Sequence, residues 1–167
     1  DMSGTGWRTL DLRGTWRPNA AHEANFGYHF DHYQLKTLVS NTANWTSGAA
    51  QNRTSAFAGK TETQALYAQD AWRFAPDWKA TLGGRWENWQ AFDGAVSNAT
   101  STLPFAKRNE TFFSPKLALS FQPAPAWALR ASLAQAYRMP SVAELYQGSI
   151  SNNAIVKNDP NLKPELA

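Results

Sequence analysis

Three histidines and an aspartate in the first 32 residues are of types that could do metal chemistry. His22, His29 and His32 lie near Asp31, and His29 and Asp31 would share one face of an extended strand. Imidazole and carboxylate groups are common metal ligands. Scattered histidines without a compact set of carboxylates, however, are far more often structural. We therefore predict no metal site and no cofactor.

Motifs for catalysis and nucleotide binding are incomplete in this sequence. Residues 59–61 read Gly-Lys-Thr, but a phosphate-binding loop would need a glycine at position 54, which is Thr54. Gly4 and Gly6 lack the third glycine and the βαβ unit of a dinucleotide-binding fold. No Gly-x-Ser-x-Gly motif occurs, and the chain has no cysteine. We predict that the protein is not an enzyme.

Aromatic and basic side chains are mixed in two polar segments, residues 36–60 and 91–109, which we expect to be long loops. Such side chains can stack on a flat chelate and attract an anion. We predict that these loops contribute to ligand capture, although ordinary loop composition explains them equally well. The candidate ligand-binding residues are Trp45, Arg53, Phe57, Phe92, Lys107 and Arg108.

The composition combines few charges with many aromatic residues. Sixteen Lys and Arg against 13 Asp and Glu give a formal net charge of +3, a small excess that does not favour nucleic acid as a partner. Charged residues make up 17% of the chain, below the roughly 25% of soluble domains, whereas aromatic residues reach 13%, with eight tryptophans. The fold must therefore place a large aromatic surface with few charges to solvate it.

Six segments alternate between apolar and polar residues, which is the period of a β-strand. In residues 8–16, Leu10, Leu12 and Trp16 point one way, while Asp11 and Arg13 point the other. The other segments are 22–30 with an extension to 35, 61–74, 78–90, 110–122 and 127–137. The pattern predicts an all-β sheet with one apolar and one polar face, and in the segment 61–74 Asp70 interrupts the apolar side.

The connections alternate between short and long. The short ones are residues 17–21, 75–77 and 123–126, and aromatic residues flank them; Trp86 and Trp89 form a second aromatic level about ten residues away. Outer-membrane barrels have short periplasmic turns, long extracellular loops and two aromatic girdles around an apolar band. The chain is therefore predicted to be a transmembrane antiparallel β-barrel segment.

Six strands cannot close a membrane-spanning barrel, because the smallest has eight strands. We therefore expect residues 1–167 to be part of a larger barrel, with the polar face lining its lumen. A solvated wall without ligand contact is the simpler interpretation of each lumen residue. The predicted lumen-facing residues are Asp11, Arg13, Lys79, Arg85, Glu87, Lys116 and Arg130.

Three ordered blocks resemble the barrel of TonB-dependent outer-membrane receptors. They are FSPKLALSF at 113–121, WALRASLAQAYRMPSVAELYQG at 127–148 and NDPNLKPE at 158–165. LGGRWE at 82–87 and YAQDAW at 67–72 are similar to upstream strands of such barrels. The resemblance implies a barrel of about 22 strands, plugged by an N-terminal domain, that imports scarce ligands with energy relayed by TonB.

The resemblance also implies partners and a location. These are TonB, acting through a plug that residues 1–167 do not contain, a ferric siderophore or similar metal chelate, and the lipid of a Gram-negative outer membrane. Two alternatives remain open: a soluble carbohydrate-binding β-sandwich that uses tryptophan platforms, and a passive porin or adhesin barrel. Glycosylation sequons leave a secreted eukaryotic protein open too; they begin at Asn44, Asn52, Asn98 and Asn109.

Overall fold

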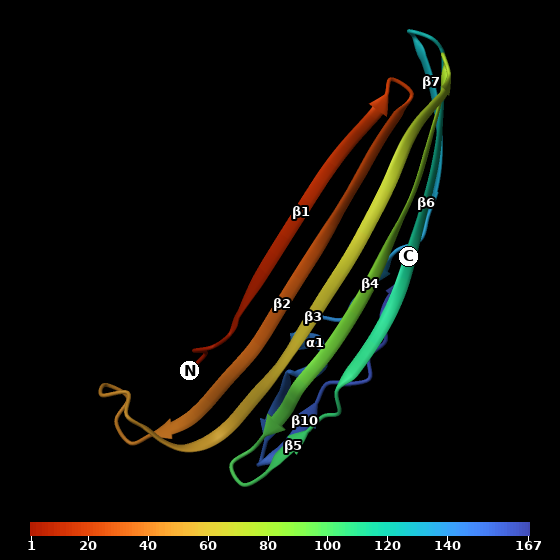
Figure 1. Cartoon of the computed structure of the whole chain (residues 1–167). Coiled ribbons are helices and arrows are strands. Elements are labelled where there is room, and N and C mark those ends of the chain that lie inside the picture. Colours follow the sequence, from red (N-terminus) through yellow and green to blue (C-terminus); the bar gives the residue numbers. More distant parts are fainter.

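A single curved β-sheet dominates the computed structural model, which describes all of residues 1–167 (Figure 1). Its six long strands follow one another in sequence order, and every pairing is antiparallel. They are β1 (Gly6–Asn19), β2 (His22–Thr42), β3 (Ala50–Ala75), β4 (Trp78–Ser97), β6 (Arg108–Ala124) and β7 (Trp127–Ala134). The short strand β5 (Thr102–Pro104) pairs with the end of β4. The predicted all-β class and the six strands are confirmed.

The strands extend further than the alternation predicts. β2 has 21 residues and β3 has 26, so the predicted loop 36–60 is mostly a hairpin that turns at residues 43–49. β4 likewise runs to Ser97, into the predicted loop 91–109. Beyond the apolar band polar and apolar residues occur on both faces of a strand, and the two-residue period that marks a strand disappears. The predicted limits of both long loops were therefore wrong.

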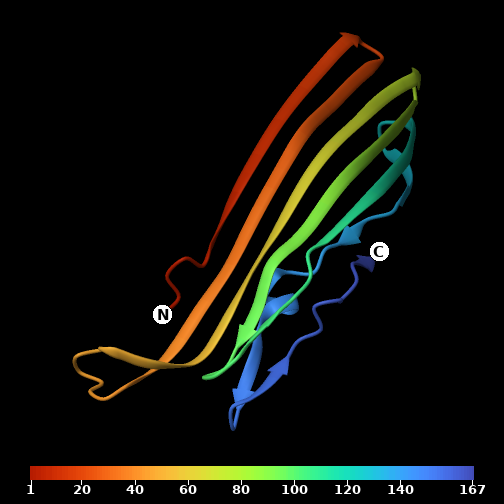
Figure 2. The ribbon, with the colours of Figure 1, turned by 60° about the horizontal axis from the view of Figure 1, so that its bottom comes forward.

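The chain after β7 returns to one face of the sheet. It contains β8 (Tyr137–Arg138), α1 (Val142–Tyr146), the hairpin β9 (Gly148–Ser151) with β10 (Ala154–Lys157), and β11 (Glu165–Leu166), which pairs with β8. Helix α1 contacts β2, β3 and β4 and lies behind them in Figure 1. Figure 2 shows that the six long strands form one layer, with the blue C-terminal segment to one side.

The face away from α1 is apolar and uncovered. The register aligns one residue from each of β1, β2, β3, β4 and β6 in a row across this face, and its members Leu12, Leu66, Trp86 and Phe113 are 45–58% exposed. A soluble sandwich would bury such a face against a second sheet. An exposed apolar face on a single layer is the arrangement of a sheet that contacts lipid. No helix of the chain is both long enough and apolar enough to cross a membrane.

Aromatic side chains gather at the short turns, as predicted. Trp78 stacks on Phe121 with ring centroids 4.3 Å apart, and the ring centroids of Phe74 and Trp72 are 5.4 Å apart. The predicted second cluster of Trp86 and Trp89 is wrong: Trp86 is 45% exposed on the apolar face, whereas Trp89 is buried on the other face. The two tryptophans are three residues apart, and an odd separation in a strand places side chains on opposite faces.

Candidate functional site

The polar face carries its charged residues in rows that run across the strands. One row joins five strands through Arg13, Gly27, Tyr67, Arg85 and Ser114. The next row toward the long loops contains Asp11, His29, Ala65, Glu87 and Phe112. A basic row therefore lies beside an acidic row.

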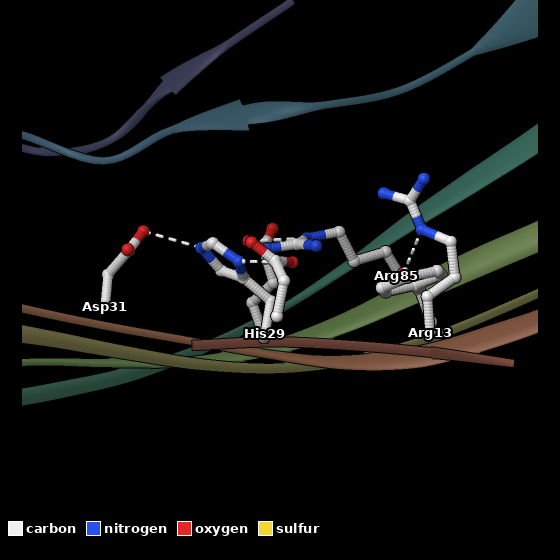
Figure 3. Close-up of polar contacts among 7 residues, drawn as sticks. Arg13, His29, Asp31 and Arg85 are labelled. Carbon is white, nitrogen blue, oxygen red and sulfur yellow. Dashed lines mark hydrogen bonds and ion pairs between the residues drawn. The ribbon is translucent and has the colours of Figure 1, made fainter. Parts of the chain in front are cut away.

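Two arginines of the basic row are held by neighbours on the sheet (Figure 3). Arg13 Nε donates a hydrogen bond to the Tyr67 hydroxyl at 3.3 Å, and Arg85 Nε donates to Glu87 Oε1 at 2.9 Å. Tyr67 reaches Arg13 by crossing β2 at Gly27, where a Cβ atom would lie 2.4 Å from the Tyr67 hydroxyl. Glycine at this position therefore lets the tyrosine join β1 to β3.

His29 bridges two carboxylates on the same face. Its Nδ1 lies 3.0 Å from Asp11 Oδ1, and its Nε2 lies 2.6 Å from Asp31 Oδ2 (Figure 3). Carboxylates accept hydrogen bonds, so only the imidazolium form of His29, with both ring nitrogens protonated, donates to the two carboxylates at once. The other oxygen of Asp31 is buried without a partner. The bridge fixes β1 against β2 at this level.

The structure places all seven predicted lumen residues on the polar face. Besides the residues of the two rows these are Lys79, Lys116 and Arg130, which lie nearer the short turns on β4, β6 and β7. A recess of about 430 Å³ lies among Arg13, Arg85 and Lys116. This face therefore carries the charged residues, whereas the opposite face is apolar.

The histidines do not converge. His22 Nδ1 lies 2.6 Å from Asp70 Oδ2 on the apolar face, and the His22 ring stacks on Trp72. His32 Nδ1 lies 3.5 Å from Glu62 Oε2. His22 and His32 thus contact one carboxylate each and His29 contacts two, and no group of three or more His, Asp or Glu side chains is placed to hold a metal ion. The His22 contact also explains how the apolar face accommodates Asp70.

Helix α1 begins with a capping box. The Ser141 hydroxyl accepts a hydrogen bond from the Glu144 amide, and Glu144 Oε2 accepts one from the Ser141 amide. Arg138 Nη2 donates to Glu144 Oε1 at 2.6 Å. The hydrogen bond from the Ser141 backbone, followed by the one from Arg138, lowers the pKa of Glu144 to about 2.

Tyr146 anchors the end of α1 on the wall. Its ring lies over Gly59 of β3 and Gly94 of β4, where a Cβ atom would lie 2.0 Å and 2.2 Å from the ring carbons. Leu145 and Tyr146 are both buried against Trp89. The hydroxyl of Tyr146 has no hydrogen-bond partner, and burial raises the pKa of this phenol. Gly59 and Gly94, on the neighbouring strands β3 and β4, therefore leave the space that the Tyr146 ring occupies, and we call this space the seat of Tyr146.

Three of the six candidate ligand-binding residues have charged side chains that already contact other parts of the chain. Arg108 Nη1 donates to the carbonyls of Pro160 and Leu162, both at 2.9 Å. Arg53 Nε donates to the Asn98 carbonyl at 3.0 Å. Lys107 Nζ lies 5.7 Å from the centroid of the Phe92 ring.

The six candidates also do not form one cluster. Trp45 lies at the tip of the β2–β3 hairpin and is 85% exposed. Arg53 and Phe57 lie on β3, and Phe92 lies on β4, where it pairs with Lys60 on the face away from α1. Sequence reasoning missed the seat of Tyr146, although the spacing of Ser141 and Glu144 is the signal of a capped helix.

Docking of α1 is expected to become weaker as the pH falls below about 4.5. The pKa of Glu144 lies below its ordinary value of 4.5, so the carboxylate stabilises the capped helix fully above that pH and loses this effect toward pH 2. Hydrogen exchange of residues 141–147 in the full receptor, corrected for the intrinsic rate at each pH, measures this effect. Glu144→Gln should abolish the pH dependence, and Glu165→Gln should retain it. An unchanged pH dependence in Glu144→Gln would contradict the assignment.

Comparison with known proteins agrees with this geometry. A family model described as TonB dependent receptor-like, beta-barrel matches residues 2–167. No curated protein and no solved structure matches the chain. The family consists of Gram-negative outer-membrane proteins that carry out TonB-dependent transport, so the soluble sandwich is not the fold of this chain. The chain belongs to the β-barrel of the TonB-dependent receptor family.

Proposed function

We propose that this chain is part of the barrel wall of an active importer of ferric siderophores. The proposal is supported by the contrast between the apolar face and the charged face of the sheet. The exposed apolar row suits lipid, whereas the charged rows and the docked α1 segment lie together on the other face, as in a hydrated lumen. A plug domain and further strands, outside residues 1–167, would close the lumen and contact TonB.

The ligand in this proposal is an iron chelate captured at the long-loop end. Trp45 supports this choice because its ring is freely exposed at the hairpin tip, where a flat chelate could stack on it. Arg53 and Arg108 support it less directly, because both guanidinium groups already bind backbone carbonyls. They would shape the loops, while Trp45 would touch the ligand.

Uptake of iron-55-labelled siderophores tests the proposal. The full-length receptor is expressed in a strain that lacks its own siderophore receptors, and uptake is compared with and without TonB. Uptake that requires both the receptor and TonB supports an active importer. Uptake that persists without TonB would identify a passive porin, and no uptake of any siderophore would refute the proposed ligand class.

Removing the exposed tryptophan is expected to weaken ligand binding. Trp45→Ala should raise the Kd for the ferric siderophore about tenfold, because a central aromatic contact of an interface is typically worth this much. The same change combined with Arg53→Ala and Phe92→Ala tests the whole set, with binding measured by fluorescence quenching. Trp127→Ala is the control, since this tryptophan is 66% exposed at the opposite end. An unchanged Kd in the triple variant would remove these residues from the binding site.

A further inference from the structure

A recess of about 360 Å³ lies at the long-loop end of β1, β2 and β3. Its charged side chains lie on the same face as the exposed apolar row. Arg8 pairs directly with His32, and Gln34 pairs directly with Lys60. Gly6 has no atom within 4 Å of where a Cβ would stand, which leaves the recess open. The complete lining is Gly4, Gly6, Trp7, Arg8, His32, Gln34 and Lys60.

The recess lies directly beyond the apolar band. Leu10 and Phe30 face each other in the last apolar row on β1 and β2, and Arg8 and His32 form the next row. Short turns mark the periplasmic end of such barrels, so the recess faces the headgroups of the outer leaflet. Its position therefore depends on the outer-membrane placement that the family implies.

The groups that line the recess are hydrogen-bond donors without a carboxylate among them. Arg8, His32, Lys60 and the Gln34 amide all present N–H groups. Two carboxylates lie beside the recess: Glu62 is 3.5 Å from His32 and Asp93 is 2.8 Å from Lys60. Neither lines the recess, and Arg8 forms no ion pair.

The basic character continues along the sheet from the recess. Lys60 and Lys107 each place their Nζ 5.7 Å from the centroid of the Phe92 ring, and the His32 ring lies 6.2 Å from the same ring. Arg8, His32, Lys60 and Lys107 thus follow one another around the outer surface. A ligand with separated anionic groups fits such an arrangement better than a single small anion does.

We propose that this recess binds a phosphate group of the phosphorylated glycolipid of the outer leaflet. Arginine and lysine form charge-assisted hydrogen bonds with phosphate oxygens. The Gln34 amide provides a neutral donor for the sugar hydroxyls. The acyl chains then lie along Leu10, Leu12 and Phe26, which are all exposed on the same face.

Native mass spectrometry of the full-length receptor in detergent tests this proposal, with bisphosphorylated lipid A as the probe. Arg8→Gln combined with Lys60→Gln should raise the Kd for lipid A at least tenfold, because two charged donors are lost. Lys79→Gln combined with Arg130→Gln removes the same charge from the polar face near the short turns and should not change the Kd. The shift in SDS-gel mobility between the unheated, compact barrel and the heat-denatured chain serves as the folding control.

Three results would overturn the proposal. The first is an unchanged Kd for lipid A in the folded Arg8→Gln/Lys60→Gln receptor. The second is equal affinity for dephosphorylated lipid A, which would show that the acyl chains alone are bound. The third is equal affinity for phosphatidylglycerol, which would assign the recess to any anionic lipid. Each result is independent of siderophore uptake, so the transport proposal is tested separately.

Discussion

An arginine in place of Leu66 is expected to lower the free energy of unfolding of the receptor in lipid by about 2–4 kcal/mol. Leu66 lies in the apolar row between Tyr28 of β2 and Trp86 of β4, and it is 56% exposed. A charge there would face hydrocarbon, which cannot solvate it. Urea unfolding in phosphatidylcholine vesicles, followed by tryptophan fluorescence and gel mobility, measures the loss.

The matched control for this change is Gln69→Arg on the same strand. Gln69 lies three residues away on the polar face, directly opposite Asn25 and Gly83, and the nearest cations, Arg85 and Lys116, line the same open recess, where water and ions screen their charge. Its arginine would meet water, and the expected loss is within about 0.5 kcal/mol. Equal losses at both positions would mean that the two faces have the same surroundings, and the assignment of the lipid-facing side would then be wrong.

The alternation of residue types was sufficient to predict the strands and their two faces. Period 2 is a direct consequence of strand geometry, and within the membrane each face meets a different solvent. Residues such as Leu82 and Arg85 therefore revealed their faces from sequence alone. Alternation also placed all seven charged candidates on one face of the sheet.

Strand ends could not be predicted from the same signal. Lys36 and Thr37 lie on strand β2 beyond its predicted end at residue 35, and both are polar although they point to opposite faces, so the alternation stops there. The prediction that Trp86 and Trp89 form one aromatic cluster failed for a related reason. It considered only how close the two residues are in sequence, and not the face of the strand to which each side chain points. Strand register is likewise needed to place Arg13 and Arg85 in one row.

The seat of α1 could not be predicted because it joins residues that are far apart in sequence. Gly59 and Gly94 resemble ordinary glycines until the register brings them under one ring. The capping box of Ser141 and Glu144 shows where α1 begins, but not which surface it covers. Only the folded chain shows that Leu145 and Tyr146 fill a gap on the wall.

Replacing Gly94 with alanine is expected to release α1 while leaving the sheet folded. The added Cβ would lie 2.2 Å from the Tyr146 ring, so the ring must leave its seat. Burial of Leu145 and Tyr146 is worth about 1.5–3 kcal/mol for each side chain. Hydrogen-exchange protection of residues 142–147 should therefore fall about tenfold or more. Gly6→Ala is the control, because no atom lies near its Cβ position.

A double-mutant cycle distinguishes loss of the seat from general damage to β4. If the alanine acts by displacing Tyr146, then Gly94→Ala in a Tyr146→Ala background should reduce protection of α1 no further, since the ring that clashes is already gone. Gly59→Ala should behave in the same way, because a Cβ there meets the other side of the ring. Additive losses would instead show that the glycines stabilise the strands themselves, and that α1 is held by Leu145 and Arg138 alone.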